Sequence, residues 1–441
     1  MRRKIIEMKT VAFKTLGCRV NLYETDALAS RFKAGGYEIV DAGEADIFVV
    51  NTCTVTNTSD QKCRQAIHQI RRNYPEALLV VTGCMVNHRK EELIQSGIAD
   101  YVIDNERKSA IFDIVEEHFH KGQSDPEGYD RDLFSYQPAY DTFHTRSLIK
   151  IHDGCNNFCS YCIIPMVRGR STSRPAKDIY DNIQSVVDHG FKEVVLTGVN
   201  LGRYQDGETD FESLVEHIIN IKGDFRVRVS SIEPDQFSDR FLQLFQHEKL
   251  APHMHICLQS GSEDTLRRMH RFYTVGQFRE MCQRIKAFRP DFNITTDIIV
   301  GFPGETEETF LESCDFAREI GFSHIHTFKY SKRTGTKAAV MPDQVPETEK
   351  TRRSEIMRAI SLENKLRYFE QLQGRSQKML VERIDSKGIA RGYGENYVPI
   401  QLPGAGLERN TFAEITLGEI LNKDNEDKMV FHGYLKKISP K

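Results

Sequence analysis

The sequence DGCNNFCSYCIIP, Asp153–Pro165, places Cys155, Cys159 and Cys162 within eight residues. Structural zinc sites use four protein ligands, so three thiols do not complete one. A 4Fe–4S cluster held by three thiolates instead keeps one iron open for a ligand that is not protein. The alternative, three cysteines that share a loop by chance, is disfavoured by their density. The stretch therefore predicts an iron–sulfur site with one open position.

The cysteine stretch begins where an apolar run, residues 147–154, ends, and five similar runs follow it. Each run has the length of a buried strand, and helical patterns separate them, which is typical of a (β/α) barrel. In such barrels the chemistry lies at the carboxyl ends of the strands. We therefore expect an α/β chain whose centre is a partial (β/α)6 barrel. The six runs are SLIKIHDG, EVVLTGV, FRVRVSSIE, HMHICLQ, FNITTDIIVG and SHIHTFKY.

Three more cysteines lie upstream, and each ends or follows an apolar run: Cys18 after VAFKTLG, Cys53 after DIFVVNT and Cys84 after ALLVVTG. These runs also alternate with helical patterns, which predicts an open parallel α/β sheet. Parallel strands bring their carboxyl ends to one edge of the sheet, where ligands bind. We expect the three thiols to meet there as a second three-cysteine site. The alternative is that each is a small buried hydrophobic residue.

The other four cysteines show no such pattern and are interpreted as structural. They are Cys63, Cys257, Cys282 and Cys314.

The composition and the hydrophobic pattern of the chain change along its length, and these changes predict the domain boundaries. Residues 8–120 form the N-terminal sheet domain, and residues 121–145, polar and rich in turns, form a linker. Residues 146–370 hold the barrel and a trailing helix with a period of 3.6. Residues 371–441 contain short alternating segments between Gly and Asn turns, which predicts a small antiparallel β-barrel.

The composition is that of an ordinary globular protein, with 39% hydrophobic and 28% charged residues, and the net charge of −3 identifies no partner. No apolar run reaches the roughly 18 residues of a membrane span. The basic start, MRRKIIEMK, is interrupted by Glu7 and Lys9 before a secretory apolar region develops. With 10 cysteines better explained as metal ligands, catalysts or core residues than as disulfides, we expect a cytoplasmic protein without a membrane partner.

The Cys-x3-Cys-x2-Cys spacing after the first barrel strand, with an aromatic residue before the last cysteine, resembles the radical S-adenosylmethionine (SAM) superfamily. The resemblance implies that SAM chelates the open iron and is cleaved to a 5′-deoxyadenosyl radical. It also implies cofactor-binding roles at the ends of successive strands: the SAM amino group near the LTGVN segment, the ribose near Glu233 and the adenine near Gly301. The implied residues are Tyr161, Gly198, Asn200, Glu233, Gln259 and Gly301. Each also has a structural reading, such as a turn glycine or a capping amide, and no catalytic residue is expected beyond the cluster ligands.

The segments TLGCRVN, NTCTVT and TGCM ahead of such a barrel, with a small β-barrel behind it, resemble the methylthiotransferases along nearly the whole chain. The resemblance implies two 4Fe–4S clusters, the second of which binds sulfide or methylsulfide on its open iron. The segment from Gly374 to Ile438 resembles the RNA-binding TRAM domain. A packing module is the alternative, because residues 371–441 carry 11 Lys and Arg against 9 Asp and Glu.

TLGCRVN and YSKRTGT look most like the branch of the family that acts on N6-threonylcarbamoyladenosine beside the anticodon of tRNA, with Arg19 and Val20 as the main discriminator. The branches acting on isopentenyladenosine or on a ribosomal-protein aspartate are alternatives. The family also implies a low-potential flavodoxin or ferredoxin as reductant. A different kind of protein, an iron–sulfur electron carrier or an RNA-binding scaffold without chemistry, is disfavoured by the intact LTGVN and SSIEP segments.

Arginines also follow the first cysteine set, at Arg168, Arg170 and Arg174 in the loop MVRGRSTSR. Their position permits two readings. They grip RNA phosphates near the reaction site, or they form salt bridges inside the barrel.

Overall fold

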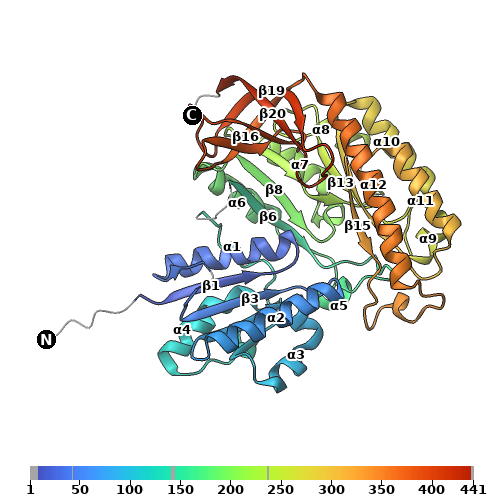
Figure 1. The fold of residues 1–441 in the computed structure, drawn as a ribbon. Coiled ribbons are helices and arrows are strands. Elements are labelled where there is room, and N and C mark those ends of the chain that lie inside the picture. Colours follow the sequence, from blue (N-terminus) through green and yellow to red (C-terminus); the bar gives the residue numbers. More distant parts are fainter. Residues whose placement is uncertain (1–7, 42, 141–144, 236–237, 439–441) are drawn as a thin grey trace.

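The computed structural model describes the whole chain except residues 1–7, 42, 141–144, 236–237 and 439–441, so most of the basic start lies outside the described residues. Figure 1 shows three packed parts: an N-terminal sheet with its helices, a central curved layer of parallel strands with helices outside it, and a small barrel near the C-terminus. The α/β class and the order of the three parts agree with the sequence-based expectation.

The N-terminal sheet is parallel throughout and has the strand order β2-β1-β3-β4-β5. Helices α1 and α4 cover one face, and α2 and α3 cover the other. Every residue of β3 and β4 is buried, which explains their continuous apolar sequence. The strands are β1 Thr10–Thr15, β2 Glu38–Ile39, β3 Ile47–Thr52, β4 Leu78–Gly83 and β5 Tyr101–Ile103, and the helices are α1 Arg19–Ala34, α2 Asn57–Asn73, α3 Cys84–Ser96 and α4 Ile111–Lys121.

The polar segment after α4 packs onto the neighbouring parts. It contains one short 3-10 turn, Pro126–Gly128. Tyr136 is buried edge-on against Tyr23 of α1, with ring centroids 5.7 Å apart. The Leu133 carbonyl accepts a hydrogen bond from the Lys150 ammonium at 2.9 Å. The segment therefore contacts both the N-terminal sheet domain and the barrel.

The central part is a half-barrel in two sheets, β11-β8-β6-β7 and β12-β13-β14-β15. Neighbouring strands are parallel except β6 and β7, which are antiparallel. Its helices bury one large apolar core against the outer strand faces. The strands are β6 Arg146–Asp153, β7 Thr172–Ser173, β8 Glu193–Gly198, β11 Arg226–Val229, β12 Ser231–Ile232, β13 His253–Ile256, β14 Asn293–Val300 and β15 His324–Lys329. The helices are α5 Ile164–Val167, α6 Ala176–Asp188, α7 Phe211–Ile219, α8 Asp239–Leu244, α9 Glu263–Arg268, α10 Val275–Phe288 and α11 Glu307–Ile320, and a two-strand hairpin joins β9 Gln205–Asp206 to β10 Thr209–Asp210.

One of the six predicted strands, FRVRVSSIE, is divided at Ser230. Its first half, β11, pairs with β8, whereas its second half, β12, pairs with β13. The half-barrel thus changes sheets in the middle of a single apolar run, and the hydrophobic pattern cannot show this because both halves are buried.

Helix α12, Glu347–Leu372, leads from the half-barrel to a closed five-stranded barrel of order β16-β17-β18-β20-β19. The expectation of an antiparallel barrel is correct for four of its five pairings, while β18 and β20 are parallel. An odd number of strands cannot alternate in direction around a closed ring, so one parallel pair is unavoidable. The strands are β16 Ser376–Ile384, β17 Ile389–Tyr393, β18 Pro399–Pro403, β19 Phe412–Leu421 and β20 Val430–Ile438.

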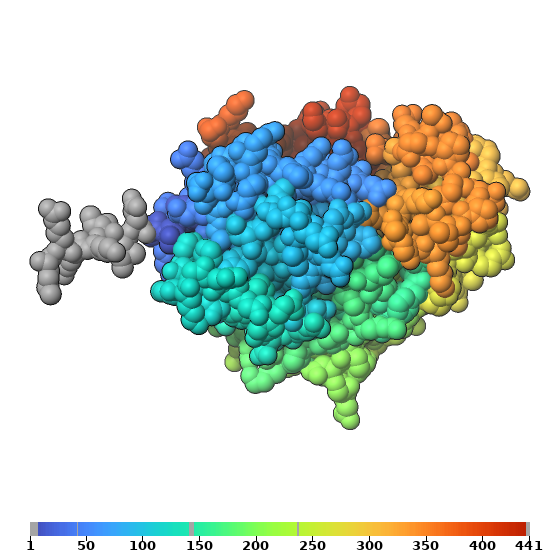
Figure 2. Space-filling view, turned by 90° about the horizontal axis from the view of Figure 1, so that it is seen from below, coloured from blue at the N-terminus to red at the C-terminus, as the bar shows by residue number. Residues whose placement is uncertain are grey.

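The N-terminal domain also touches the segment between β15 and α12. Arg333 donates hydrogen bonds to Asn57 and Thr54, and Figure 2 shows this orange segment bordering the blue N-terminal domain. Of the helices in the described part of the chain, none is both long and apolar enough to cross a membrane.

Candidate active site

A cavity of about 1550 Å³ lies where the N-terminal sheet, the half-barrel and the C-terminal barrel meet. The carboxyl ends of β1, β3 and β4 form one wall. The carboxyl ends of β6 and β8, together with residues along β13 and the first half of β14, form another. Residues of the C-terminal barrel, including Arg391, Tyr393 and Tyr397, form a third. All six cysteines predicted as ligands line it: Cys18, Cys53, Cys84, Cys155, Cys159 and Cys162.

The first cysteine set lies in the loop after β6. The loop turns sharply at Gly154, whose φ is +67° and where a Cβ would lie 2.0 Å from the Arg170 carbonyl oxygen, so only glycine fits. The Cys155 amide donates to the Gly169 carbonyl at 3.2 Å, and that of Cys162 donates to the Cys159 carbonyl at 3.0 Å. These bonds hold the three thiols on one side of a compact turn.

The electrostatics of this set suit a bound cation. Burial raises the pKa of the Cys162 thiol to about 12, and it also raises that of Cys159 although Arg271 opposes the shift. Thiols in such surroundings become thiolates when a metal supplies positive charge. The Arg271 guanidinium donates to Cys159 Sγ at 3.1 Å, and the Asn200 amide donates to Cys155 Sγ at 3.5 Å. Donors of this kind stabilise metal-bound sulfur.

The second set forms at the carboxyl edge of the N-terminal sheet, as the strand order predicts. Cys18 precedes α1, Cys53 follows β3 and Cys84 begins α3 after β4. Burial raises the pKa of Cys53 to about 11, and Cys84 and Cys18 are close enough to raise it further. A Cβ on Gly17, where φ is +111°, would lie 2.8 Å from the Cβ of Cys53. The glycine before Cys18 thus lets the two cysteine loops approach each other.

A buried group of five charges lies between the two sets. Glu24 of α1 accepts from Lys108 at 2.5 Å, from Lys150 of β6 at 2.8 Å and from Arg168 at 3.2 Å. Asp153, at the end of β6, binds Lys150 at 2.6 Å and Arg168 at 2.9 Å. Although burial raises the pKa of Glu24, Arg168, Lys108 and Lys150 hold it well below the ordinary value. Because these residues come from both domains, the group fixes one cysteine set relative to the other.

Of the residues implied to bind SAM, four line the cavity: Tyr161, Gly198, Glu233 and Gln259. Asn200 reaches it through its hydrogen bond to Cys155. Gln259 has a φ of +68°, a strained conformation for a residue with a side chain and one that concentrates at functional sites. Gly301 lies apart from the cavity lining: its amide donates to Glu305 at 2.7 Å, and Lys350 packs over it.

Arg271 is a site residue that the sequence did not reveal. It bridges the two predicted groups, because its guanidinium contacts both Cys159 and the carboxylate of Glu233. In the sequence it follows Arg267 and Arg268, and nothing in the spacing distinguishes it from them. The fold makes the distinction, since Arg267 and Arg268 pair with Asp264 on the exposed side of α9.

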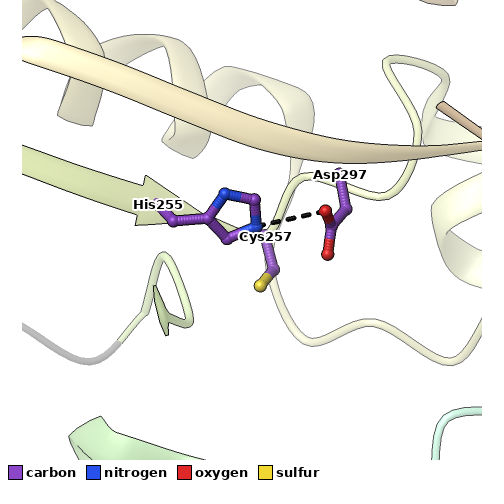
Figure 3. Close-up of side chains that lie close together, drawn as sticks. All are labelled: His255, Cys257 and Asp297. Atoms are coloured by element: carbon purple, nitrogen blue, oxygen red, sulfur yellow. Dashed lines mark ion pairs between the residues drawn. The ribbon is translucent and has the colours of Figure 1, made fainter. Parts of the chain in front are cut away.

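His255, Cys257 and Asp297 form a further cluster on the cavity wall, with ligand atoms all within 4.8 Å of one another. Figure 3 shows His255 and Asp297 pointing toward each other, and His255 Nε2 lies 3.2 Å from Asp297 Oδ1.

Of the four cysteines interpreted as structural, Cys257 faces the cavity rather than filling the core, whereas Cys282 and Cys314 do lie in the barrel core. Cys63 is buried and its thiol donates to the Cys53 carbonyl at 3.3 Å.

Comparisons with known proteins show to which family the chain belongs. Residues 10–104 match the model of the uncharacterized protein family UPF0004, and residues 149–317 match that of the radical SAM superfamily. Threonylcarbamoyladenosine tRNA methylthiotransferase MtaB of Bacillus subtilis is 38% identical over 413 residues, which are 90% of this chain and 91% of that protein. This chain belongs to the methylthiotransferase family.

Two further matches complete the comparison of this methylthiotransferase. The tRNA-2-methylthio-N(6)-dimethylallyladenosine synthase of Syntrophus aciditrophicus is 33% identical over 86% of this chain and 84% of that protein. The radical SAM methyltransferase TsrM from Kitasatospora setae superposes with a TM-score of 0.55 at 14% identity, covering 76% of this chain and 77% of that one. The second likeness bears on the fold alone.

As a methylthiotransferase with these two family matches, the enzyme uses SAM and iron–sulfur chemistry. The donor set fits such cofactors: each cysteine set offers three thiols and opens onto the shared cavity, and all ten cysteines are free of disulfides. The shared cavity of about 1550 Å³ is the space available for further ligands.

The arginines after the first cysteine set have separate roles in the methylthiotransferase structure. Arg168 is buried on Glu24 and Asp153, and Arg174 is buried on Asn182 and Tyr23. The reading as a salt bridge inside the barrel is correct for Arg168 through Asp153, although its second partner, Glu24, belongs to the N-terminal domain. Arg174 instead forms hydrogen bonds to neutral groups. Arg170 alone of the three is exposed, and it lies over the Phe158 ring at 4.6 Å.

Proposed function

We propose that this enzyme inserts a methylthio group at C2 of N6-threonylcarbamoyladenosine next to the anticodon of tRNA. The observation that supports it most directly is the meeting of two three-cysteine sets in one cavity, in a chain whose relatives include the Bacillus subtilis enzyme named for this nucleoside. The C2–H bond of adenine is too weakly acidic for general acid–base catalysis to break. Insertion of sulfur there needs a group that removes hydrogen and a separate source of sulfur.

The two cysteine sets divide these tasks in the proposal. With a 4Fe–4S cluster on each set and SAM at the first, the cofactors supply a carbon radical and a sulfur donor. Cys155, Cys159 and Cys162 hold the radical-forming cluster, and Tyr161, Gly198, Asn200, Glu233, Gln259 and Gly301 are proposed to orient SAM. Cys18, Cys53 and Cys84 hold the sulfur-bearing cluster. Arg271 orients Glu233 and donates to Cys159, so it links the SAM site to its cluster.

The remaining parts of the proposal concern partners and domains. Residues 371–441 serve as the RNA-binding TRAM domain, after the N-terminal domain of residues 8–120, the connecting segment 121–145 and the radical SAM domain of residues 146–370. A low-potential flavodoxin or ferredoxin supplies the electron, and the tRNA substrate implies a cytoplasmic reaction. Residues of β16 and β17 border the cavity, so an anticodon loop held by this barrel can turn its base toward both cysteine sets.

Mass spectrometry of tRNA nucleosides tests the substrate. Cells without the gene should lose 2-methylthio-N6-threonylcarbamoyladenosine and accumulate its unmodified precursor, while 2-methylthio-isopentenyladenosine and the methylthio-aspartate of ribosomes persist. An unchanged level of the first nucleoside would refute the assignment. A protein that yields no 5′-deoxyadenosine when reduced anaerobically with SAM would be an electron carrier or an RNA-binding scaffold instead.

A further inference from the structure

The Arg19 guanidinium belongs to the wall of the cavity. Arg19 follows Cys18 directly, begins α1 and is exposed. Among the residues that the structure describes, its side chain forms no ion pair and no hydrogen bond. The two deeper arginines of the same cavity differ from it in this respect. Arg168 is paired with Glu24 and Asp153, and Arg271 is paired with Glu233.

The wall that faces Arg19 presents rings rather than carboxylates, and two further arginines, Arg146 and Arg228, lie over the ring of Tyr397. It includes His253, His326 and Tyr397, each of which feels the Arg19 charge. Burial, together with His324 and His255, lowers the pKa of His326 to about 4, and burial and Arg228 lower that of His253, so both rings are neutral at pH 7. A carboxylate of this wall, Asp297, lies 3.2 Å from His255 Nε2. None of the described carboxylates forms an ion pair with the Arg19 guanidinium, so its position is open to an anion from a ligand.

The proposed substrate does provide one, and this inference rests on the proposed function. The threonylcarbamoyl group adds a carboxylate to N6 of adenine, whereas a dimethylallyl group adds only hydrocarbon. C2 and the N6-bearing carbon both flank ring nitrogen N1, so the two positions lie on the same side of the base. A group that holds the N6 substituent must therefore lie close to the group that delivers sulfur to C2. Arg19 meets this condition because it is the residue next to Cys18 of the proposed sulfur site.

We propose that Arg19 binds the carboxylate of the threonylcarbamoyl group and is the residue that selects this nucleoside over dimethylallyladenosine. The guanidinium fork matches a carboxylate with two parallel hydrogen bonds, which adds geometric selection to charge. The positive end of the α1 dipole lies at the same place and adds to the attraction. The neutral imidazoles opposite are suited to the urea and hydroxyl groups of the same substituent.

The test uses the full-length reconstituted enzyme and three anticodon stem-loop RNAs. One carries threonylcarbamoyladenosine, the second its carboxyl methyl ester and the third dimethylallyladenosine. The enzymes compared are the wild type, Arg19→Gln, Arg19→Lys and the control Arg383→Gln, which removes an exposed cation from another wall of the cavity. Dissociation constants and kcat/KM are measured anaerobically, and iron content verifies that each variant is loaded equally.

The wild type should bind and convert the acid RNA roughly 10- to 100-fold better than the ester, as expected for a charge-assisted hydrogen bond. Arg19→Gln should lose that factor on the acid RNA, so that its acid-to-ester ratio approaches one, and Arg19→Lys should restore part of it. Arg383→Gln should leave the ratio at the wild-type value. This pattern, in binding as well as in turnover, is not expected from a residue that only supports the fold.

An equal decrease on acid and ester RNAs in Arg19→Gln would overturn the proposal, because Arg19 would then bind RNA phosphate or stabilise the Cys18 loop. The proposal fails equally if Arg19→Gln keeps the wild-type ratio. A wild-type enzyme that converts the dimethylallyl RNA but not the threonylcarbamoyl RNA would instead overturn the proposed function, and the third RNA separates that outcome from the others.

Discussion

Cys159 and Cys53 line one cavity but follow strands of different sheets, so substitutions can separate their roles. Cys159→Ala should abolish cleavage of SAM, because the first cluster loses a ligand beside Arg271. Cys53→Ala should retain cleavage and stop sulfur insertion. Anaerobic assays that measure 5′-deoxyadenosine and methylthio-nucleoside in the same reaction check both expectations.

Cys314→Ala is the matched control for these two variants, because Cys314 is buried in the barrel core and does not line the cavity. It should keep both products. If Cys159→Ala and Cys53→Ala lost SAM cleavage to the same extent, the division of labour between the two sets would be wrong.

His152, which lies near the first cysteine set, should make the free energy of unfolding depend on pH. Burial lowers its pKa from 6.5 to about 4, and its Nε2 lies 2.7 Å from Ser171 Oγ. The unfolded chain therefore takes up a proton at a higher pH than the folded protein, and the free energy of unfolding falls as pH drops from about 6.5 to about 4. The decrease is roughly 3 kcal/mol over the whole range.

Denaturant unfolding of the wild type and His152→Gln between pH 7 and pH 5 measures this contribution. The difference between the two proteins cancels groups that they share, and it should shrink as the pH falls. A difference that does not change with pH would show that His152 is not held neutral.

The positions of the six cysteines could be predicted because this needed only local spacing or the rule that parallel strands end at one edge, and their role as cluster ligands stays a prediction. Arg271 was not. Its two partners lie 112 and 38 residues away in the chain, and a pairing over such separations leaves no trace in a single sequence.

Strands β16 and β17 bring two arginines directly opposite each other on the cavity wall. Arg383 and Arg391 are a cross-strand pair, and both line the cavity. Like charges in this position repel, and Asp385, 3.7 Å from Arg391, offsets part of the repulsion. The double variant Arg383→Ala/Arg391→Ala should weaken tRNA binding and reduce the slope of log affinity against log salt by roughly 0.7–0.9 for each phosphate that it no longer binds.

Binding assays at several salt concentrations measure that slope. Lys62→Ala, which removes an exposed cation from α2 outside the cavity, is the control and should leave it unchanged. Equal slopes for the wild type and the double variant would mean that the C-terminal barrel is a packing module.

At the level of elements, the hydrophobic pattern located all six runs of the half-barrel and the small C-terminal barrel, although not its strand β17. It could not show the division of one run into β11 and β12, since burial is the same whichever neighbour a strand pairs with. The parallel pairing of β18 and β20 likewise follows from closure of the ring, which is a property of all five strands together.

The buried charges around Glu24 make the whole molecule sensitive to one carboxylate. Glu24→Gln leaves Lys150 and Arg168 with Asp153 as their remaining anion, and leaves Lys108 with no ion pair among the described residues. Removal of one partner from a buried ion group typically costs about 3–5 kcal/mol. Denaturant unfolding should show a decrease of that size, with near-wild-type stability for the control Glu91→Gln on the exposed side of α3. A decrease below about 1 kcal/mol would mean that water or rearrangement compensates the missing charge.

The same buried charges determine how cooperatively the protein unfolds. The half-barrel contributes Lys150, Asp153 and Arg168 to this group, and the N-terminal domain contributes Glu24 and Lys108. Separation of the two domains would therefore leave buried ions of both signs without partners. Calorimetry should therefore record a single cooperative melting event for these two domains rather than one for each. A gene fragment that encodes either half alone should yield an insoluble or molten product, so point substitutions can separate the two cysteine sets but division of the chain cannot.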